Sequence, residues 1–417
     1  MASAHGEQFD LRPWQIAAKA EWVGAGRRGI VAAATGTGKT RLAAAALGGL
    51  DQGWVTVVVV PTKALQSQWI QVLARLLAMR PDRIGTVGGD APQLTMEQRV
   101  IVAVLNSARD RIPPLVNHWH SAGLKVLLVV DECHRAGAPD TASALWSVEY
   151  DATLGLSATP ERGDDGLDDI LIPRMGEVVY RYSLVSALDD GLLAPLAVAN
   201  IYVDLDALSL SEYQRLEQRV RDQLAAGLSA DAPVIKRIRT EQAQVIRRAG
   251  GRTAALKSLV RGGLVDGRRT LIFHETIEQA TMTAEVLDGA GISHSLEHSK
   301  LSSETRATSL RRFANGAVDC LVTVRALDEG IDVPDANLAL ICSGTMNPRQ
   351  RIQRAGRVVR PSGDSSLVVS LLTNGTSEET VVGTRDSTLF GATRVNHIAN
   401  WNAKDASALV SFLRTLK

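Results

Sequence analysis

The sequence contains few cysteines and few aromatic residues. Its three cysteines, Cys133, Cys320 and Cys342, lie far apart among 417 residues and do not have the spacing of metal ligands. This pattern excludes a disulfide scaffold and a cysteine-based metal cluster, and it suits a reducing cytosol. Aromatic residues make up 4% of the chain, so stacking on aromatic side chains is not expected to dominate the binding of any ligand.

The chain also lacks an excess of charge of either sign and a long apolar run. Its formal net charge is +1, so any contact with a polyanion has to come from local patches and backbone amides. The first ten residues contain no apolar signal core, and no stretch is long enough to span a bilayer. We therefore expect an intracellular, cytoplasmic, soluble protein that makes no contact with membranes.

The hydrophobic residues occur in short uninterrupted runs, separated by longer stretches with helical spacing. Such runs indicate strands that are buried on both faces of a parallel sheet. The first series of runs is 29–33, 55–60, 100–104, 125–130 and 153–156, and the second is 197–203, 270–273, 320–324, 338–342 and 367–372. The two series predict an α/β protein with two domains, each a mainly parallel sheet flanked by helices.

A stretch of different character separates the two series. Residues 236–269 hold ten lysines and arginines against two acidic residues, which indicates either a solvated helical connector or a stripe that faces phosphates. We expect a first domain at 1–195, a helical basic linker at 196–255, a second domain at 256–385 and a helical extension at 386–417.

A glycine-rich loop follows the first predicted strand and begins a predicted helix at 39–47. Its residues are Thr35, Gly36, Thr37, Gly38, Lys39 and Thr40. The two glycines permit a tight path in which backbone N–H groups point at phosphate oxygens, and the helix N-terminus adds partial positive charge. Lys39 can reach the β- and γ-phosphates of a nucleotide, and the hydroxyl of Thr40 can ligate Mg²⁺. The loop therefore predicts a site for ATP and Mg²⁺.

Two adjacent carboxylates, Asp131 and Glu132, follow the predicted strand at 125–130. Ligands of parallel α/β sheets bind at the carboxyl ends of the strands, where these side chains should lie. Asp131 would hold Mg²⁺ largely through water, and Glu132 would orient and activate the attacking water. Together with the phosphate loop, this pair favours hydrolysis of the nucleotide over binding alone.

Two further groups point to the same nucleotide from opposite ends of the chain. Gln15 precedes the first strand, and a glutamine amide can hydrogen-bond N6 and N7 of adenine together. Arg357 and Arg360 lie three residues apart, so a helix would place them on one face. Arginines so placed stabilise the charge on a γ-phosphate during transfer. If both ends address one nucleotide, ATP lies between two domains, and its hydrolysis changes their arrangement.

These motifs and their order resemble those of the superfamily 2 helicases, most closely the XPB-like DEAD/DEAH-box branch. ATPases that resemble the res subunit of type III restriction enzymes have similar motifs. The resemblance covers nearly the whole chain. The matching segments are 11–15, 33–40, 60–69, 131–134, 154–162, 271–274, 328–334 and 353–360. One departure is Ala33, which stands where the first glycine of the phosphate loop is usual.

The resemblance implies two RecA-like domains with ATP in the cleft between them and nucleic acid across both. Arg12 belongs with Gln15 to the adenine motif, and Gly330 and Asp332 would complete the nucleotide site from the second domain. Arg357 and Arg360 would be the arginine fingers. The residues that would couple the γ-phosphate to domain movement are Ser157, Thr159 and Gln353. Those that would contact a nucleic-acid strand, mostly at phosphates, are Pro61, Thr62, Lys63, Asn106, Ser107 and Thr323.

The leading hypothesis is an ATP-dependent DNA helicase or translocase that moves along nucleic acid. One alternative is the same motor acting on RNA, although the branch resemblance favours DNA. Another is the motor subunit of a restriction, defence or repair complex, in which a protein partner supplies strand separation, targeting or nuclease activity. A non-hydrolysing ATP-gated clamp is a third, which Glu132 and the arginine pair oppose. The sequence holds no long insertion, zinc cluster or sizeable further domain, which favours translocation over unaided unwinding.

Overall fold

The computed structural model of the chain describes residues 9–88, 94–95, 97–162, 164–324, 336–342, 347–359, 365–399 and 406–416. The chain divides into two compact units: the first holds Met1–Leu193, and the second holds most of the chain from Ala194 onward. Each unit contains a seven-stranded parallel sheet. The α/β class with two sheets, predicted from the apolar runs, is therefore confirmed.

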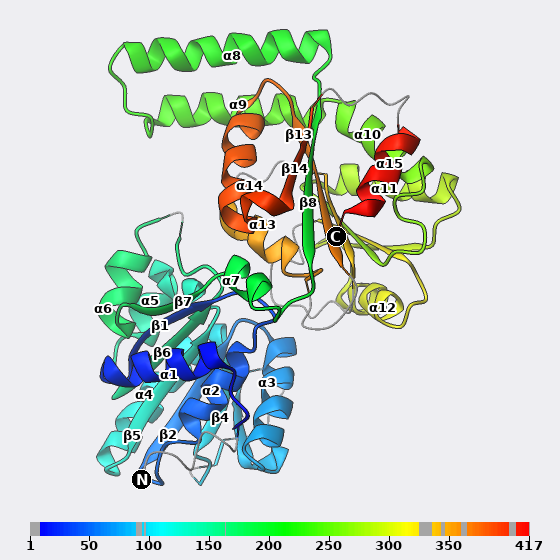
Figure 1. Cartoon of the computed structure of the whole chain (residues 1–417). Coiled ribbons are helices and arrows are strands. Elements are labelled where there is room, and N and C mark those ends of the chain that lie inside the picture. Colours follow the sequence, from blue (N-terminus) through cyan, green and yellow to red (C-terminus); the bar gives the residue numbers. More distant parts are fainter. Residues whose placement is uncertain are drawn as a thin grey trace. The chain divides into compact units, whose positions relative to one another are not determined.

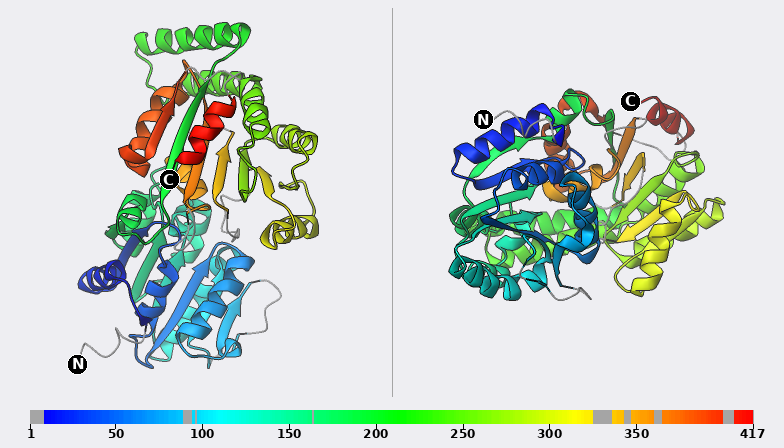
Figure 2. Two further views of the ribbon diagram at one scale, coloured as in Figure 1. Left: turned by 45° about the vertical axis from the view of Figure 1, so that its right-hand side comes forward. Right: turned by 90° about the horizontal axis from the view of Figure 1, so that it is seen from below.

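The first sheet has the strand order β3-β4-β2-β5-β6-β1-β7. Its strands are β1 (Arg28–Ala33), β2 (Trp54–Val60), β3 (Ile84–Val87), β4 (Val100–Val104), β5 (Lys125–Asp131), β6 (Ala152–Ser157) and β7 (Val178–Tyr182). The helices of this unit are α1 (Pro13–Gly24), α2 (Lys39–Leu47), α3 (Lys63–Leu76), α4 (Leu105–Ser121), α5 (Pro139–Leu145), α6 (Ile172–Met175) and α7 (Leu184–Asp189). Helices α1, α2 and α3 adjoin one another, and α4, α5 and α6 pack with the apolar cluster on the opposite face (Figure 1, Figure 2).

The second sheet has the strand order β10-β11-β9-β12-β13-β8-β14. Its strands are β8 (Leu196–Val203), β9 (Thr270–His274), β10 (His294–Glu297), β11 (Cys320–Val324), β12 (Leu338–Ile341), β13 (Ser366–Thr373) and β14 (Val395–Ile398). The helices are α8 (Ala207–Ala225), α9 (Pro233–Arg248), α10 (Gly251–Arg261), α11 (Ile277–Gly289), α12 (Ser303–Ala314), α13 (Pro348–Ala355), α14 (Gly383–Phe390) and α15 (Ala406–Thr415). Side chains of α10, α11 and α15 form the main apolar core with one face of this sheet.

Helices α8 and α9 form an antiparallel pair, drawn in green in Figure 1, between β8 and α10. The pair has its own apolar cluster, which includes Tyr213, Leu216, Val220, Ile235 and Ile238. The expected linker at 196–255 also contains β8, which lies inside the second sheet between β13 and β14. The expected helical extension at 386–417 likewise contains strand β14, which pairs with β8. Both spans therefore contribute strands to the sheet of the second unit.

Several helices begin where a side-chain oxygen satisfies the unpaired amides of the first turn. Thr62 accepts from the amide of Leu65 at the start of α3, and Asp206 accepts from the amides of Leu208 and Ser209 at the start of α8. Asn347 does the same for α13 by accepting from the amide of Arg349. Side chains of this type cap helices because the first four amides have no partner within the helix.

A buried ion pair anchors α13 to the second unit. The guanidinium of Arg351 donates from Nε to Oδ1 of Asp386 at 2.7 Å and from Nη2 to the hydroxyl of Ser370 at 3.1 Å. Asn200 on β8 donates to the same carboxylate at 2.9 Å. The side chains of Arg351 and Asp386 are 2% and 0% exposed. A charge pair in such a place holds its elements in one arrangement, because removing one partner leaves the other charge buried without compensation.

We expect Asp386→Ala to lower the free energy of unfolding of the second unit by about 3–5 kcal/mol, since Arg351 would remain buried without its carboxylate. Urea unfolding followed by circular dichroism measures this change. The matched control in the same unit is Glu212→Ala, which breaks the exposed pair of Arg248 and Glu212 and should cost less than about 1 kcal/mol. Equal losses in the two variants would contradict the role given to the buried pair.

Candidate functional site

The glycine-rich loop lies between β1 and α2, as its sequence predicts. Gly36 and Gly38 have φ angles of 80° and 101°, a left-handed conformation that glycine adopts without steric cost. The hydroxyl of Thr37 donates to the carbonyl of Ala34 at 2.7 Å and tightens the loop. The ammonium of Lys39 donates to the carbonyl of Ala33 at 2.9 Å. A loop of this shape before a helix N-terminus presents backbone amides to an anion.

Arg12 and Gln15 attach the start of α1 to this loop. The amide nitrogen of Gln15 donates to the carbonyl of Gly38 at 2.9 Å, and the guanidinium of Arg12 donates to the carbonyl of Thr37 at 2.8 Å. Gln15 is fully buried, and its amide oxygen accepts from the backbone N–H of Arg12 at 2.9 Å. The neighbouring Trp14 stacks on Tyr182, with the ring centroids 5.0 Å apart. In this structure both polar atoms of the Gln15 amide are therefore bonded within the protein and are not presented to an adenine base.

Asp131 ends β5, and both of its oxygens accept hydrogen bonds. Oδ1 accepts from the backbone N–H of Glu132 at 3.0 Å, and Oδ2 accepts from the indole N–H of Trp69 at 2.8 Å. Burial and the adjacent Glu132 raise the pKa of Asp131 to about 6, while Lys39 and the Trp69 hydrogen bond oppose that rise. Glu132 itself has φ 48° and ψ 51°, a conformation that costs a non-glycine residue energy and is common at functional sites.

A chain of polar contacts joins Glu132 to β6. Nδ1 of His134 lies 3.1 Å from the hydroxyl of Ser157 and 3.5 Å from Oε2 of Glu132. The same hydroxyl accepts from the backbone N–H of Thr159 at 3.2 Å. The guanidinium of Arg162 donates to the carbonyl of His134. The structure thus brings the expected coupling residues Ser157 and Thr159 to the expected catalytic carboxylate.

The residues expected to hold Mg²⁺ offer a donor set that suits it. Thr40 provides a hydroxyl on the first turn of α2, and Asp131 provides a carboxylate at the end of β5. Mg²⁺ prefers oxygen ligands and keeps several waters when it bridges protein and phosphate. In the described residues no group of three or more His, Cys, Asp or Glu side chains could hold a metal by themselves.

Five of the residues expected to contact a nucleic-acid strand follow the ends of β2 and β4, which are paired neighbours in the first sheet. Lys63 and Asn106 are exposed at the first turns of α3 and α4, and Pro61, Thr62 and Ser107 are half-buried. All five therefore lie at the carboxyl ends of the strands, as the phosphate loop and the carboxylates do.

Thr323 does not lie at the surface. It is fully buried on β11, and its hydroxyl donates to Oε2 of Glu297 at 3.0 Å. Glu297 is fully buried as well and accepts from Nε of Arg306 at 2.7 Å. The expected contact with a strand is replaced by an internal hydrogen bond, because β11 is flanked by β10 and β9 and covered on both faces.

The arginine motif of the second unit differs from a continuous helix. Helix α13 ends at Ala355, and Gly356 is its C-cap, so Arg357 lies in the following turn and is half-buried. Gln353 is half-buried on α13, and the guanidinium of Arg354 lies 5.2 Å from the ring centroid of Phe273. The prediction that one helix carries Arg357 and Arg360 is therefore wrong. Gly330, Asp332 and Arg360 lie outside the described residues.

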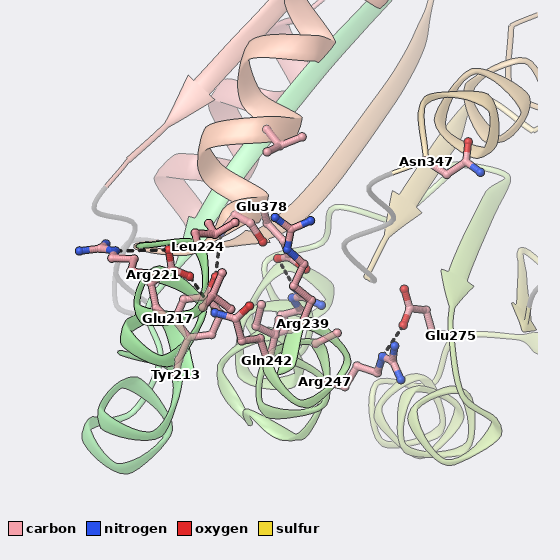
Figure 3. Close-up of a pocket in the computed structure, with 16 residues that line it drawn as sticks. Tyr213, Glu217, Arg221, Leu224, Arg239, Gln242, Arg247, Glu275, Asn347 and Glu378 are labelled. Carbon is pink, nitrogen blue, oxygen red and sulfur yellow. Dashed lines mark hydrogen bonds and ion pairs between the residues drawn. The ribbon is translucent and has the colours of Figure 1, made fainter. Parts of the chain in front are cut away.

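The second unit also contains a pocket of about 590 Å³ at the base of the α8–α9 pair (Figure 3). Arginines of the basic stretch line it, but carboxylates accompany them. Arg247 lies 2.8 Å from Glu275, and Arg252 forms a buried ion pair with Glu378. Such pairing favours a packed connector over a stripe that faces phosphates.

Sequence reasoning missed Trp69 and undervalued His134 as members of this site. The signal for His134 was its place two residues after Glu132. Trp69 lies six residues after the start of α3, and only the packing of α3 against the sheet brings it to Asp131. In the described part of the chain, no helix has the length and apolar character that a bilayer crossing requires.

Comparisons with known protein families match both units. The family described as type III restriction enzyme, res subunit, matches residues 8–162, and the helicase conserved C-terminal domain matches residues 251–362. The first match contains the phosphate loop, the two carboxylates, Ser157 and Thr159. The second begins at α10 and contains the arginine motif.

Individual proteins are similar over most of the chain. The "DNA 3'-5' translocase XPB2" of Sulfurisphaera tokodaii is 26% identical over 392 residues, which cover 89% of this chain and 83% of that protein. The "Putative DNA 3'-5' helicase Rad25" of Halobacterium salinarum is 32% identical over 389 residues, 89% of this chain and 55% of that protein. The chain thus spans about half the length of this second relative.

A solved structure shares the fold at low sequence identity. S. cerevisiae Dbp5 bound to RNA and ADP BeF3 superposes with a TM-score of 0.62 at 14% identity, and the alignment covers 99% of both chains. At this identity the similarity establishes the arrangement of strands and helices and nothing about the ligand.

We expect Gly38→Ala to weaken binding of ATP about tenfold or more, because a left-handed alanine costs about 1–3 kcal/mol. A Cβ at this position would also lie 2.8 Å from the amide nitrogen of Gln15. Titration with a fluorescent ATP analogue measures the affinity. Gly24→Ala is the matched control, since a Cβ there meets nothing within 4 Å. Unchanged affinity in Gly38→Ala would show that the loop tolerates the side chain.

Proposed function

We propose, from the premise that this chain belongs to the superfamily 2 helicases in their XPB-like branch, that it is an ATP-dependent DNA helicase or translocase. It hydrolyses ATP to move along nucleic acid. The observation that carries this proposal is the set of contacts in the first unit that runs from Asp131 through Glu132 and His134 to Ser157 and Thr159. Asp131, Glu132, His134 and Ser157 are joined through atoms 3.0–3.5 Å apart.

The residues of the first unit divide the chemistry among them. Lys39 and the amides of the phosphate loop bind the phosphates of ATP, and Thr40 and Asp131 would hold Mg²⁺, largely through water. When bound, Mg²⁺ would neutralise charge on the transferred phosphate. Glu132 orients and activates the attacking water. His134 and Ser157 transmit the state of the γ-phosphate from Glu132 to Thr159.

The second unit is proposed to supply the remaining groups of the nucleotide site. Gly330 and Asp332 would complete it, and Arg357 and Arg360 would stabilise the charge that develops on the γ-phosphate. Gln353 would join the coupling set. We propose that the first unit is the ATP-binding helicase domain and that the second is the RecA-like helicase domain with the α8–α9 pair inserted.

DNA is the favoured substrate. Both sequence relatives described above carry DNA in their names, whereas the RNA-bound structure shares the fold at 14% identity. The proposed contacts from Pro61, Thr62, Lys63, Asn106 and Ser107 would go mostly to phosphates, which hold a strand without reading its sequence. An intracellular location is part of this proposal, because the substrate lies inside the cell.

A motor that depends on a protein partner is the second candidate. In the described residues, the α8–α9 pair is the main addition to the two sheets and the helices that cover them. This composition favours a motor to which another protein adds further functions. A partner would then supply strand separation, targeting or nuclease activity. Strand displacement that appears only when a partner is added would support this candidate.

We expect Glu132→Gln to lower kcat for ATP hydrolysis by at least about 100-fold, because the amide cannot accept the proton of the attacking water. Binding of ATP should persist, since the side chain keeps its shape. The assay compares hydrolysis without nucleic acid and with single-stranded DNA, duplex DNA, a fork and RNA of matched length. Strand displacement is measured on the fork. Stimulation by RNA alone, or unchanged turnover in the variant, would contradict the proposal.

We expect Arg357→Ala to lower kcat by about 10³-fold with little change in ATP affinity, as the loss of an arginine finger does. Single-turnover hydrolysis and a binding titration separate the two quantities. Arg312→Ala, which removes an exposed arginine from α12 of the same unit, is the control and should match the unmodified protein. A loss of ATP affinity with kcat unchanged would instead assign Arg357 to ground-state binding.

A further inference from the structure

We infer that Trp69 is a positioning residue that connects the proposed strand-contacting turn of α3 to the metal-side carboxylate Asp131. The inference rests on the proposed function, because it concerns how nucleic acid stimulates hydrolysis at that site. It goes beyond that function by naming a physical link between two parts of the first unit.

The link starts from how the carboxylate is held. Its two oxygens have donors from different elements: the amide of Glu132 follows β5, whereas the indole of Trp69 belongs to α3. The Trp69 side chain is 2% exposed, so water does not compete for the bond. A carboxylate fixed by two donors has a defined orientation, and a shift of either donor changes it.

Two buried side chains on successive turns of helix α3, Gln66 and Trp69, bond it to the first sheet. One turn before Trp69, the buried amide of Gln66 donates to the carbonyl of Val102 at 2.8 Å and to that of Val87 at 3.2 Å. Gln66 therefore fixes α3 to β3 and β4, and Trp69 fixes it to the end of β5. The helix begins directly after Thr62, which caps it. A strand bound at 61–63 thus contacts the start of an element whose next two turns are bonded to the sheet and to Asp131.

The indole bond distinguishes Trp69 from the other buried tryptophans. Trp22 and Trp146 donate to the backbone carbonyls of Thr153 and Ala136, and the indole nitrogens of Trp14 and Trp119 have no hydrogen-bond partner. Among the tryptophans that the structure describes, Trp69 is the one whose N–H meets a carboxylate. A bond to a charged acceptor is stronger than one to a neutral carbonyl. We therefore assign this hydrogen bond a role beyond packing of the indole ring.

The test uses two substitutions that separate the donor from the volume of the ring. Trp69→Phe retains an aromatic ring but has no N–H, whereas Trp69→His retains a ring N–H with a smaller ring. Trp119→Phe is the matched control, because Trp119 is 1% exposed in the same unit and its indole has no partner. All variants are made in the full chain, and their thermal unfolding is recorded.

The first readout is the Mg²⁺ concentration that half-saturates binding of a fluorescent, non-hydrolysable ATP analogue. We expect Trp69→Phe to raise it about tenfold or more, as the loss of an outer-shell partner does. Trp69→His should recover part of the loss, and Trp119→Phe should leave it unchanged. Because no hydrolysis is involved, this readout stands even if the protein proves not to be stimulated by DNA.

The second readout is the ratio of hydrolysis rates with and without single-stranded DNA. We expect this ratio to fall in Trp69→Phe while the affinity for the DNA is preserved, because the strand still binds but no longer acts on Asp131. Equal behaviour of Trp69→Phe and Trp119→Phe in both readouts would overturn the inference. Greater impairment of Trp69→His than of Trp69→Phe would overturn it as well, since ring volume would then be what matters. Failure of the unmodified protein to hydrolyse ATP would instead overturn the proposed function.

Discussion

The register of three parallel strands is the constraint on which the site depends. Asp131 on β5 lies opposite Leu156 on β6, and Ser157 lies opposite Ala32 on β1. The carboxyl ends of β1, β5 and β6 therefore lie side by side. The phosphate loop, the two carboxylates, Ser157 and Thr159 lie at or directly after these ends. A shift of one residue in this pairing would turn each side chain to the other face of the sheet. The burial of all three strands on both faces penalises such a shift and so maintains the site.

The two units use charge differently. In the first unit the charged groups gather at the strand ends, where Lys39, Asp131 and Glu132 face a prospective ligand. In the second unit, arginines are buried inside the fold: Arg351 pairs with Asp386, and Arg252 pairs with Glu378. Buried pairs add little net stability, but they resist any rearrangement that would separate them. The buried pair of Arg351 and Asp386 therefore fixes the position of helix α13, which precedes Arg357.

The central strands of both sheets could be predicted from sequence, and the edge strands could not. All ten predicted runs are strands, whereas β3, β7, β10 and β14 were not predicted and form the four sheet edges. An edge strand is partly exposed, so β7 and β14 lack the uninterrupted apolar run that identifies a strand buried on both faces. The phosphate loop and the carboxylates of the first unit were predictable because each follows a central strand. Thr323 was misplaced because a motif gives the position of a residue in the chain and not the direction of its side chain.

Asp131 has one hydrogen-bond donor from its own motif, the amide of Glu132, and one from tertiary packing, the indole of Trp69. Burial raises the pKa of Asp131, and repulsion by the adjacent Glu132 raises it further. A guanidinium beside Asp131 would relieve that repulsion, but it would also cancel the negative charge that attracts a divalent cation. An indole N–H and a backbone amide stabilise the carboxylate while leaving its charge in place. Trp69 is a neutral donor of this kind, and α3 brings its indole to the carboxylate.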